Sequence, residues 1–219
     1  MTVPAAEQAL AEGRLDDALQ ALQGAVREAP ARGELRVFLF QLLCVQGAWD
    51  RALNQLRVAG ELDPSTFPMV QAYREAIRCE SLREAVFAGH RQPMPLGQPE
   101  AWIALYFEAL RHTSGGRHGE AAELRDRALE LVPETPGTVG EGDRFEWIVD
   151  ADSRIGPFLE AFVDGGYYWV PFSRVAELHV EAPEDLRDLV WAPATFTWTN
   201  GGKLVGFVPT RYPGPFAAA

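Results

Sequence analysis

A pattern of seven residues that recurs after 34 positions is the feature that most constrains how this chain can fold. The first copy comprises Gly13, Leu15, Ala18, Leu19, Leu22, Ala25 and Pro30, and the second comprises Gly47, Trp49, Ala52, Leu53, Leu56, Ala59 and Pro64. Seven matches at one fixed offset are hard to produce by chance. The segment is therefore an internal repeat, which points to a fold built from stacked identical units.

The residue types of the repeat fit a pair of antiparallel helices. A glycine permits the tight turn between the two helices, small alanines let the helices approach closely, and a proline stops the second helix. A helix–turn–helix unit of 34 residues is the tetratricopeptide repeat. The first part of the chain is therefore predicted to stack helix pairs.

A less regular continuation of this pattern reaches residue 133. Glycine, alanine and proline recur at an offset of 103 from the first copy, at Gly116, Ala121, Ala128 and Pro133. Before this copy, apolar spacing predicts a helix over 67–89, and the prolines and glycine of 93–99 interrupt its partner. Further helices are predicted over 100–112 and 118–132. We expect a tetratricopeptide-like helical domain over residues 1–133.

Two of the predicted helices carry more apolar side chains than one buried stripe requires. The segments 35–45 and 102–110 are apolar on nearly every face, which is typical of helices that are buried all round. Core packing explains any one of these residues, but a short helical array cannot cover every face with its own neighbours. The set is therefore predicted to form a groove for an amphipathic partner helix. The predicted groove residues are Phe38, Phe40, Leu42, Trp102, Tyr106 and Phe107.

The remaining residues are predicted to form a linker and a second, smaller domain. Residues 134–142 are rich in glycine and proline and read as the linker; their GxxGxG run lacks the strand and the Lys-Ser/Thr of a phosphate loop. Residues 143–219 hold four of the six tryptophans. We predict there a short helix from 155 or 157 to 163, a helical turn within 182–190, and strands over 167–171, 175–180, 194–199 and 204–208. The fold class is thus α+β, with a helical repeat domain followed by a β-rich α+β domain.

Composition and charge exclude several classes of function. The formal net charge of −11 disfavours a protein that tracks a nucleic-acid backbone. The two cysteines, Cys44 and Cys79, lie in apolar helix-like stretches and are expected to be buried thiols in a reducing compartment. The opening residues lack the basic and apolar regions of a signal peptide, and no apolar run approaches the roughly 18 residues that would span a bilayer. We expect a soluble, cytoplasmic protein that does not contact membranes.

Catalytic chemistry has one weak candidate. Asp150 and Asp152 are one residue apart and could share a cation or act as acid and base, with Glu146 nearby. However, Arg154 offers a local ion-pair partner, the four histidines are scattered, and none of the serines lies in a GxSxG motif. We therefore expect no catalytic residues, no metal and no cofactor.

Several ordered motifs resemble the ImpE/TagJ family of type VI secretion accessory proteins. They are FEWIVDADSRIGPFLE at 145–160, GYYWVPF at 166–172, DLRDLVW at 185–191 and FVPTRY at 207–212. The opening segments ALAEGRLDDAL at 9–19 and RVFLFQLL at 36–43 are similar to the opening of the same family. The resemblance covers nearly the whole chain. Family members usually continue for several dozen residues after the last motif, so the end of the second domain is expected to be missing here.

The resemblance implies a function that is compatible with the residue patterns. Proteins of this family are cytoplasmic accessories that bind the N-terminal helix of the small contractile-sheath subunit. They are linked to sheath recycling by an AAA+ unfoldase, an indirect partner of this chain by the same resemblance, and the sequence leaves open whether the two proteins touch directly. We therefore predict a non-enzymatic adaptor whose groove holds that helix.

Two alternatives remain open. In one, the second domain binds another cytoplasmic protein through a surface that includes Tyr168, Trp169 and Trp191. In the other, which is the least favoured, Asp150, Asp152 and Glu146 form a metal-dependent active site.

Overall fold

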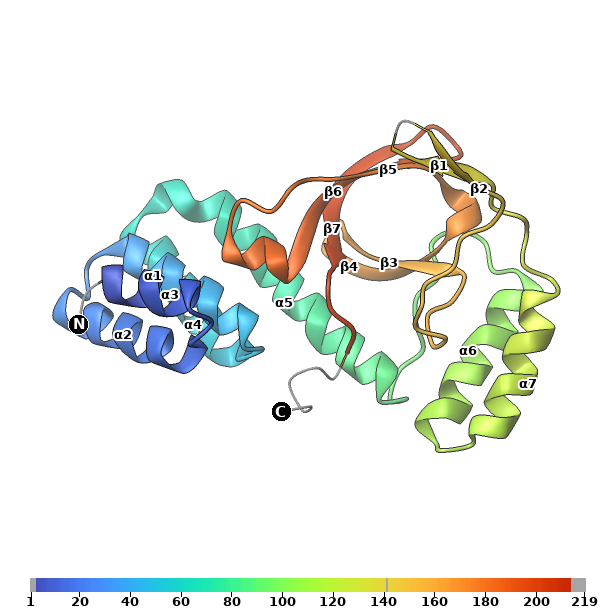
Figure 1. The fold of residues 1–219 in the computed structure, drawn as a ribbon, viewed down its shortest axis with the longest axis horizontal. Coiled ribbons are helices and arrows are strands. Elements are labelled where there is room, and N and C mark those ends of the chain that lie inside the picture. Colours follow the sequence, from blue (N-terminus) through green and yellow to red (C-terminus); the bar gives the residue numbers. More distant parts are fainter. Residues whose placement is uncertain (1–2, 141, 214–219) are drawn as a thin grey trace. The chain divides into compact units, whose positions relative to one another are not determined.

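The computed structural model describes residues 3–140 and 142–213, and these residues fall into two compact units (Figure 1). The described residues up to Arg78 form the first unit together with the distant segment Ala182–Ala192. The second unit comprises Cys79–Glu181 and Pro193–Pro213. This division differs from the expected boundary at 134–142, because two of the later helices group with the sheet and not with the repeats.

The first unit is built from helix pairs, as the repeat predicts. Its helices are α1 (Val3–Ala11), α2 (Leu15–Glu28), α3 (Gly33–Val45), α4 (Trp49–Leu62), the short 3-10 helix η1 (Pro64–Thr66) and the first part of α5 (Phe67–Phe87). The glycines that open the two copies, Gly13 and Gly47, have φ of 73° and 69°. This left-handed conformation suits glycine and turns the chain from one helix into the next.

The repeated apolar residues supply the interfaces between these helices. The alanines Ala18 and Ala52 and the leucines Leu22 and Leu56 are fully buried. Small side chains allow the helix axes to come close, while the leucines fill the space that remains. Equivalent positions therefore form equivalent helix–helix contacts in both copies, which explains why the pattern repeats.

The second unit combines a helix pair with a curved five-stranded antiparallel sheet (Figure 1). The helix pair is α6 (Ala101–Ser114) and α7 (His118–Leu129). The sheet has the order β4-β3-β7-β6-β5, and the 3-10 helix η2 (Phe172–Arg174) joins β4 to β5. Its strands are β3 (Phe158–Val163), β4 (Gly166–Pro171), β5 (Val175–Val180), β6 (Trp191–Trp198) and β7 (Lys203–Pro209).

Both faces of the sheet are covered by apolar side chains. On one face, Phe158 of β3 packs against Trp102 and Tyr106 of α6, with ring centroids 4.9 and 5.6 Å apart. On the other face, Ala161, Val163, Val170, Ala194, Phe196 and Trp198 form a cluster of their own. Large aromatic side chains therefore contribute to the core on both faces, with Phe158, Trp102 and Tyr106 on one and Phe196 and Trp198 on the other.

The predicted helix ending at residue 163 is wrong, because residues 158–163 form strand β3. The segment is apolar at nearly every position because both faces of the sheet are covered there, and this removes the alternation expected of a half-buried strand. The overlooked signal is Asp164-Gly165, whose φ angles of 48° and 68° make the two-residue turn into β4.

The stretch predicted as a linker also contains regular structure. Strand β1 (Gly137–Val139) pairs with β2 (Asp143–Phe145) as a small antiparallel sheet.

The broader expectations for the fold agree with the structure. The α+β class is confirmed, with seven α-helices followed by the strands in the described residues. Both cysteines are buried and neither is in a disulfide. Among the described helices, none has the length and apolar character required to cross a membrane.

We predict that Gly156→Ala lowers the free energy of unfolding by about 3 kcal/mol or more. Gly156 has a φ of 57°, and an added Cβ would lie 1.8 Å from the hydroxyl oxygen of Tyr106. Gly140→Ala is the matched control, because Gly140 has a φ of 58° but open space around it. The control should cost only about 1 kcal/mol of backbone strain, measured by urea denaturation. Equal losses would show that the contact with Tyr106 is unimportant.

Candidate functional site

A segment from far along the sequence packs against the helices of the first unit. We call residues 182–192 the strap; it contains the 3-10 helix η3 (Leu186–Leu189). The backbone N–H of Leu186 donates a hydrogen bond to the side-chain oxygen of Gln41 on α3, at 3.1 Å. Gln41 is only 8% exposed. The strap backbone therefore satisfies the oxygen of this buried polar side chain.

Arg187 fixes the strap to the start of α5. Its guanidinium lies 4.7 Å from the centre of the Tyr73 ring, donates to the sulfur of Met69 at 2.9 Å, and pairs with Asp185. Burial raises the pKa of Tyr73 to about 12, so its hydroxyl stays protonated at neutral pH. The guanidinium thus binds a neutral aromatic face, which is a cation–π contact.

Trp191 ends the strap in an aromatic cluster. Its ring lies 5.6 Å from Trp49 and 5.9 Å from Tyr73, and Tyr73 in turn packs edge-on against Phe40 at 5.7 Å. Trp191 is fully buried. Because a buried tryptophan removes a large apolar area from water, this residue contributes most to holding the strap in place.

Internal hydrogen bonds give the strap a defined shape. The carboxylate of Asp188 accepts from the backbone N–H groups of Glu184 and Asp185, both at 3.0 Å, and the side chain of Asp185 accepts from the backbone of η3 in return. This reciprocal arrangement is a capping box. The strap is consequently a fixed wall and not a loose loop.

The strap and the helices border a shallow, open groove of about 640 Å³, which we call the α3–strap groove. The helices contribute Glu7, Glu34, Val37, Phe38 and Gln41, and the strap contributes Pro183, Glu184, Asp185, Leu186 and Leu189. Phe38 is half-buried, and Leu189 is 52% exposed although it is a large apolar residue. The groove therefore offers apolar side chains that the first unit itself does not cover.

The residues predicted to form a partner groove are divided between the two units. Phe38 lines the α3–strap groove, whereas Phe40 and Leu42 are fully buried inside the first unit. Trp102 and Tyr106 are buried in the second unit, where Phe107 packs half-buried against Phe158. Of the six residues, only Phe38 lines this groove.

The aromatic residues predicted as a secondary surface are also divided. Trp191 is buried at the end of the strap in the first unit. Trp169 is fully buried in the second unit, where it contacts Phe87 and Phe158. Tyr168 is half-buried against the opposite face of the sheet. These three side chains do not form one exposed aromatic surface.

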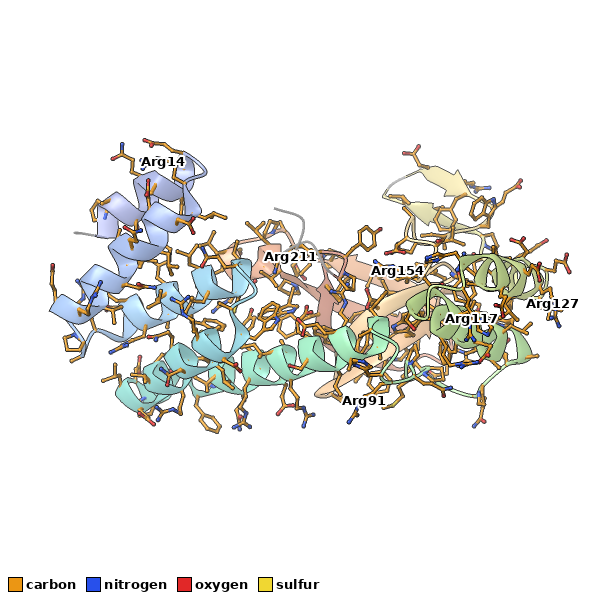
Figure 2. The ribbon with its side chains drawn as sticks, turned by 90° about the horizontal axis from the view of Figure 1, so that it is seen from below. Arg14, Arg91, Arg117, Arg127, Arg154 and Arg211 are labelled. Carbon is orange, nitrogen blue, oxygen red and sulfur yellow. The ribbon has the colours of Figure 1, made fainter. Side chains whose placement is uncertain are left out.

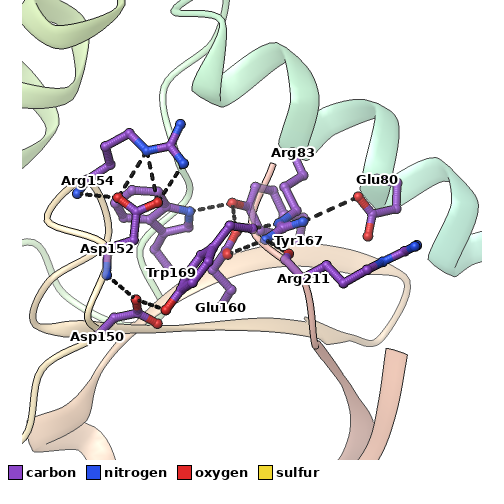
Figure 3. Close-up of polar contacts among 10 residues, drawn as sticks. Glu80, Arg83, Asp150, Asp152, Arg154, Glu160, Tyr167, Trp169 and Arg211 are labelled. Carbon is purple, nitrogen blue, oxygen red and sulfur yellow. Dashed lines mark hydrogen bonds and ion pairs between the residues drawn. The ribbon is translucent and has the colours of Figure 1, made fainter. Parts of the chain in front are cut away.

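A buried charged network lies between α5 and the sheet of the second unit (Figure 3). Arg83 donates to both carboxylate oxygens of Glu160, at 2.8 and 2.7 Å, and to the backbone carbonyl of Arg211 at 2.7 Å. Burial alone would lower the pKa of Arg83, but the hydrogen bonds and the charge of Glu160 raise it above its ordinary value. The arginine is therefore permanently charged.

Two aromatic side chains complete this network. Tyr167 donates its hydroxyl to Glu160, and the indole N–H of Trp169 donates to the oxygen of Tyr167 at 2.5 Å. Burial, followed by the charge of Glu160, raises the pKa of Tyr167 well above its ordinary value. Because the network is buried and hydrogen-bonded, it positions α5, β3, β4 and the end of the described chain against one another.

The carboxylates considered for catalysis are engaged in local contacts near this network (Figure 3). Asp152 forms a bidentate ion pair with Arg154, and although burial would raise the pKa of Asp152, the hydrogen bonds from Arg154 lower it. Asp150 accepts from the Tyr212 hydroxyl at 2.8 Å. Glu146 is exposed. In the part of the chain that the structure describes, no three His, Cys, Asp or Glu side chains converge as a metal site.

The strap side of the groove was missed from the sequence. Glu184, Leu186 and Leu189 form one wall with a helical partner on α3 that lies more than 140 positions earlier in the chain. The available signals were the acid-capped turn at 185–188 and the single polar residue Gln41 within an apolar run. Neither signal indicates which distant segment it contacts.

Comparison with known proteins gives matches over both parts of the chain. The family model described as ImpE protein matches residues 142–219, and a tetratricopeptide repeat model matches residues 9–77. The chain is 55% identical over 208 residues to the type VI secretion system accessory component TagJ of Pseudomonas aeruginosa, which covers 94% of this chain and 73% of the relative.

A solved structure has the same fold. The X-ray crystal structure of a protein from Vibrio parahaemolyticus matches with a TM-score of 0.85 at 26% sequence identity. The match covers 94% of this chain and 78% of the other chain.

We predict that Trp191→Ala lowers the free energy of unfolding by about 3–5 kcal/mol, because it leaves a large cavity beneath the strap. Trp147→Ala is the matched control, since Trp147 is 65% exposed and should change stability by about 0.5 kcal/mol or less. Chemical denaturation followed by circular dichroism measures both. Similar losses for the two variants would contradict the central role of Trp191.

We also predict that Arg83→Met destabilises the protein by about 3–5 kcal/mol, because Glu160 is left buried without its counter-charge. The double variant Arg83→Met/Glu160→Leu should recover part of that loss, because Glu80, which is also buried and paired with Arg83, keeps its charge. Arg57→Met removes an exposed pair with Glu61 and should cost about 0.5 kcal/mol. Thermal and chemical denaturation measure the stability of these variants. A double variant that is no more stable than Arg83→Met would refute the explanation.

Proposed function

Because the chain belongs to the ImpE family, which includes TagJ, we propose that it is a non-enzymatic accessory protein of type VI secretion that holds the N-terminal helix of the small sheath subunit. The resemblance seen in the sequence is confirmed by the family model and by the 55% identical relative. Membership supports an accessory role in type VI secretion. The partner, the helix and a cytoplasmic location are the parts that we propose.

The observation that carries this proposal is the α3–strap groove on a tetratricopeptide-like unit. Phe38 and Val37 on α3 and Leu186 and Leu189 on the strap provide apolar side chains on both walls. An amphipathic helix binds such a groove by placing an apolar stripe into it. A few anchors worth roughly 2 kcal/mol or more each are sufficient for specific binding.

The contacts of Asp150 and Asp152 indicate a structural role for these carboxylates and not a catalytic one. Asp152 is paired with Arg154, and Asp150 holds Tyr212. Both contacts fix the loop that precedes β3 and the segment that follows β7. The proposed function therefore assigns these residues to the scaffold.

A second site for a protein partner is favoured by one observation in the second unit. A cleft of about 670 Å³ lies between the β1–β2 hairpin and strand β5, and its lining includes Val139, Phe145, Leu159 and Leu178. Val139 is 64% exposed. The alternative hypothesis is that the second unit contacts a protein partner. This cleft is a candidate location for that contact in place of Trp169 and Trp191.

We predict that Phe38→Asp abolishes binding of a labelled peptide carrying the first ~20 residues of the small sheath subunit, about five helical turns. Fluorescence anisotropy with the full chain measures the affinity. The aspartate would place a charge against the apolar stripe of the helix, whereas it can still reach water in the unbound protein.

Phe67→Asp is the matched control, because Phe67 is 60% exposed on α5 and does not line the groove. The control variant should bind as tightly as the wild type, and circular dichroism should show both variants folded. Peptide binding that survives Phe38→Asp would move the site away from the α3–strap groove. The second-unit cleft would then be tested with Val139→Asp.

A further inference from the structure

We infer that the α3–strap groove selects helices in which lysine and arginine flank the apolar stripe. The inference rests on the proposed use of this groove and specifies the chemistry of its partner. It follows from the charges at the rim, from the engagement of nearby arginines, and from one buried amide.

Every charged residue that lines the groove is acidic. Glu7 and Glu34 lie on the helical wall, and Glu184 and Asp185 lie on the strap wall. Acids on both walls place negative charge along both sides of a bound helix. A helix with basic residues on each flank of its apolar stripe matches this arrangement.

Two of these acids are available to a partner. Within the described part of the chain, the side chains of Glu7 and Glu184 form no ion pair, and both residues are exposed. Glu34 has only an exposed contact with Arg32 at 3.4 Å, while Asp185 is committed to Arg187. The basic side chains of the first unit therefore neutralise only part of the negative charge at the rim of the groove.

Two other arginines of the first unit have partners outside the groove. Arg14 lies at the turn between α1 and α2 (Figure 2), where it pairs with Glu12 and Asp17. Arg36 on α3 donates to the side chain of Gln55 at 2.9 Å. Neither guanidinium lines the groove. A bound helix would consequently supply the missing positive charge.

Gln41 adds a polar donor to the groove. Its oxygen is occupied by the N–H of Leu186, so its amide nitrogen remains as a donor without a hydrogen-bond partner among the described residues. This nitrogen can therefore donate to a polar acceptor on a bound segment. The groove thus combines apolar side chains and acidic side chains on both walls with one hydrogen-bond donor.

Exposed charges of this kind determine specificity and association rate more than total affinity. Each rim pair is screened by salt, and its contribution is small in comparison with the apolar anchors. The expected signature is therefore binding that depends on ionic strength and discriminates strongly between basic and acidic helices with the same apolar stripe.

Two synthetic 20-residue helices test the inference with the full chain. Both carry the same leucine stripe; one has lysines on its flanks and the other has glutamates. We expect the lysine helix to bind at low salt and the glutamate helix to bind at least about tenfold more weakly, as measured by fluorescence anisotropy. Raising the salt concentration should reduce this difference.

The double variant Glu7→Gln/Glu184→Gln should lower the affinity for the lysine helix by about fivefold at low salt. Asp50→Asn/Glu61→Gln is the matched control, because it removes the same charge from α4 of the same unit outside the groove. Equal weakening by the two double variants would overturn the inference, since the attraction would then come from the net charge of −11. Equal binding of the two helices, or no binding of the lysine helix, would also overturn it.

The sheath-subunit peptide, measured in parallel, separates this inference from the proposed function. If that peptide binds through Phe38 while the lysine and glutamate helices bind alike, only the inference about charge fails. If the lysine helix binds in the groove and the sheath peptide does not, the proposed partner is wrong and the charge preference of the groove stands.

Discussion

The insertion of Trp191 between Trp49 and Tyr73 is the contact on which the first unit depends. Two helix pairs leave an apolar face that they cannot cover themselves, and longer arrays of this kind cover it by adding repeats. Here a segment from the later part of the chain covers it. The hydrogen bond from Leu186 to Gln41 and the stacking of Arg187 on Tyr73 then set the position of the strap. The α3–strap groove exists only because the strap lies there.

The second unit depends on a different constraint, which is that it buries the charged carboxylate of Glu160. Glu160 lies on a strand whose neighbouring positions are apolar, and it is tolerated because Arg83, Tyr167 and the rest of the network satisfy its oxygens. Burying such a network costs free energy, and removing one of its charged partners destabilises the folded protein. In return it requires one relative placement of α5, β3 and β4, since a shift of any of these elements would leave a charge unpaired.

The helical repeat could be predicted from the sequence because it depends on local spacing. Glycine at the turn and alanine at the interface have the same role in each copy, so the pattern identifies the helices and their pairing. Strand β3 could not be predicted in the same way, because contacts from distant segments on both of its faces remove the alternation. The groove was predicted only at Phe38. Its other wall comes from the strap, and a contact between residues 41 and 186 leaves no periodic signal in either segment.

The strap also determines the order in which the protein can be completed during synthesis. It lies between β5 and β6, so the chain leaves the second unit, packs against the first and returns. The first four helices emerge from the ribosome well before Trp191, and during that interval the aromatic site around Tyr73 has no occupant. The helical unit therefore reaches its complete packing only after the strap has been synthesised, unlike a domain whose residues are contiguous in the sequence. More than a hundred residues separate Tyr73 from Trp191, so this aromatic cluster is completed only late in translation.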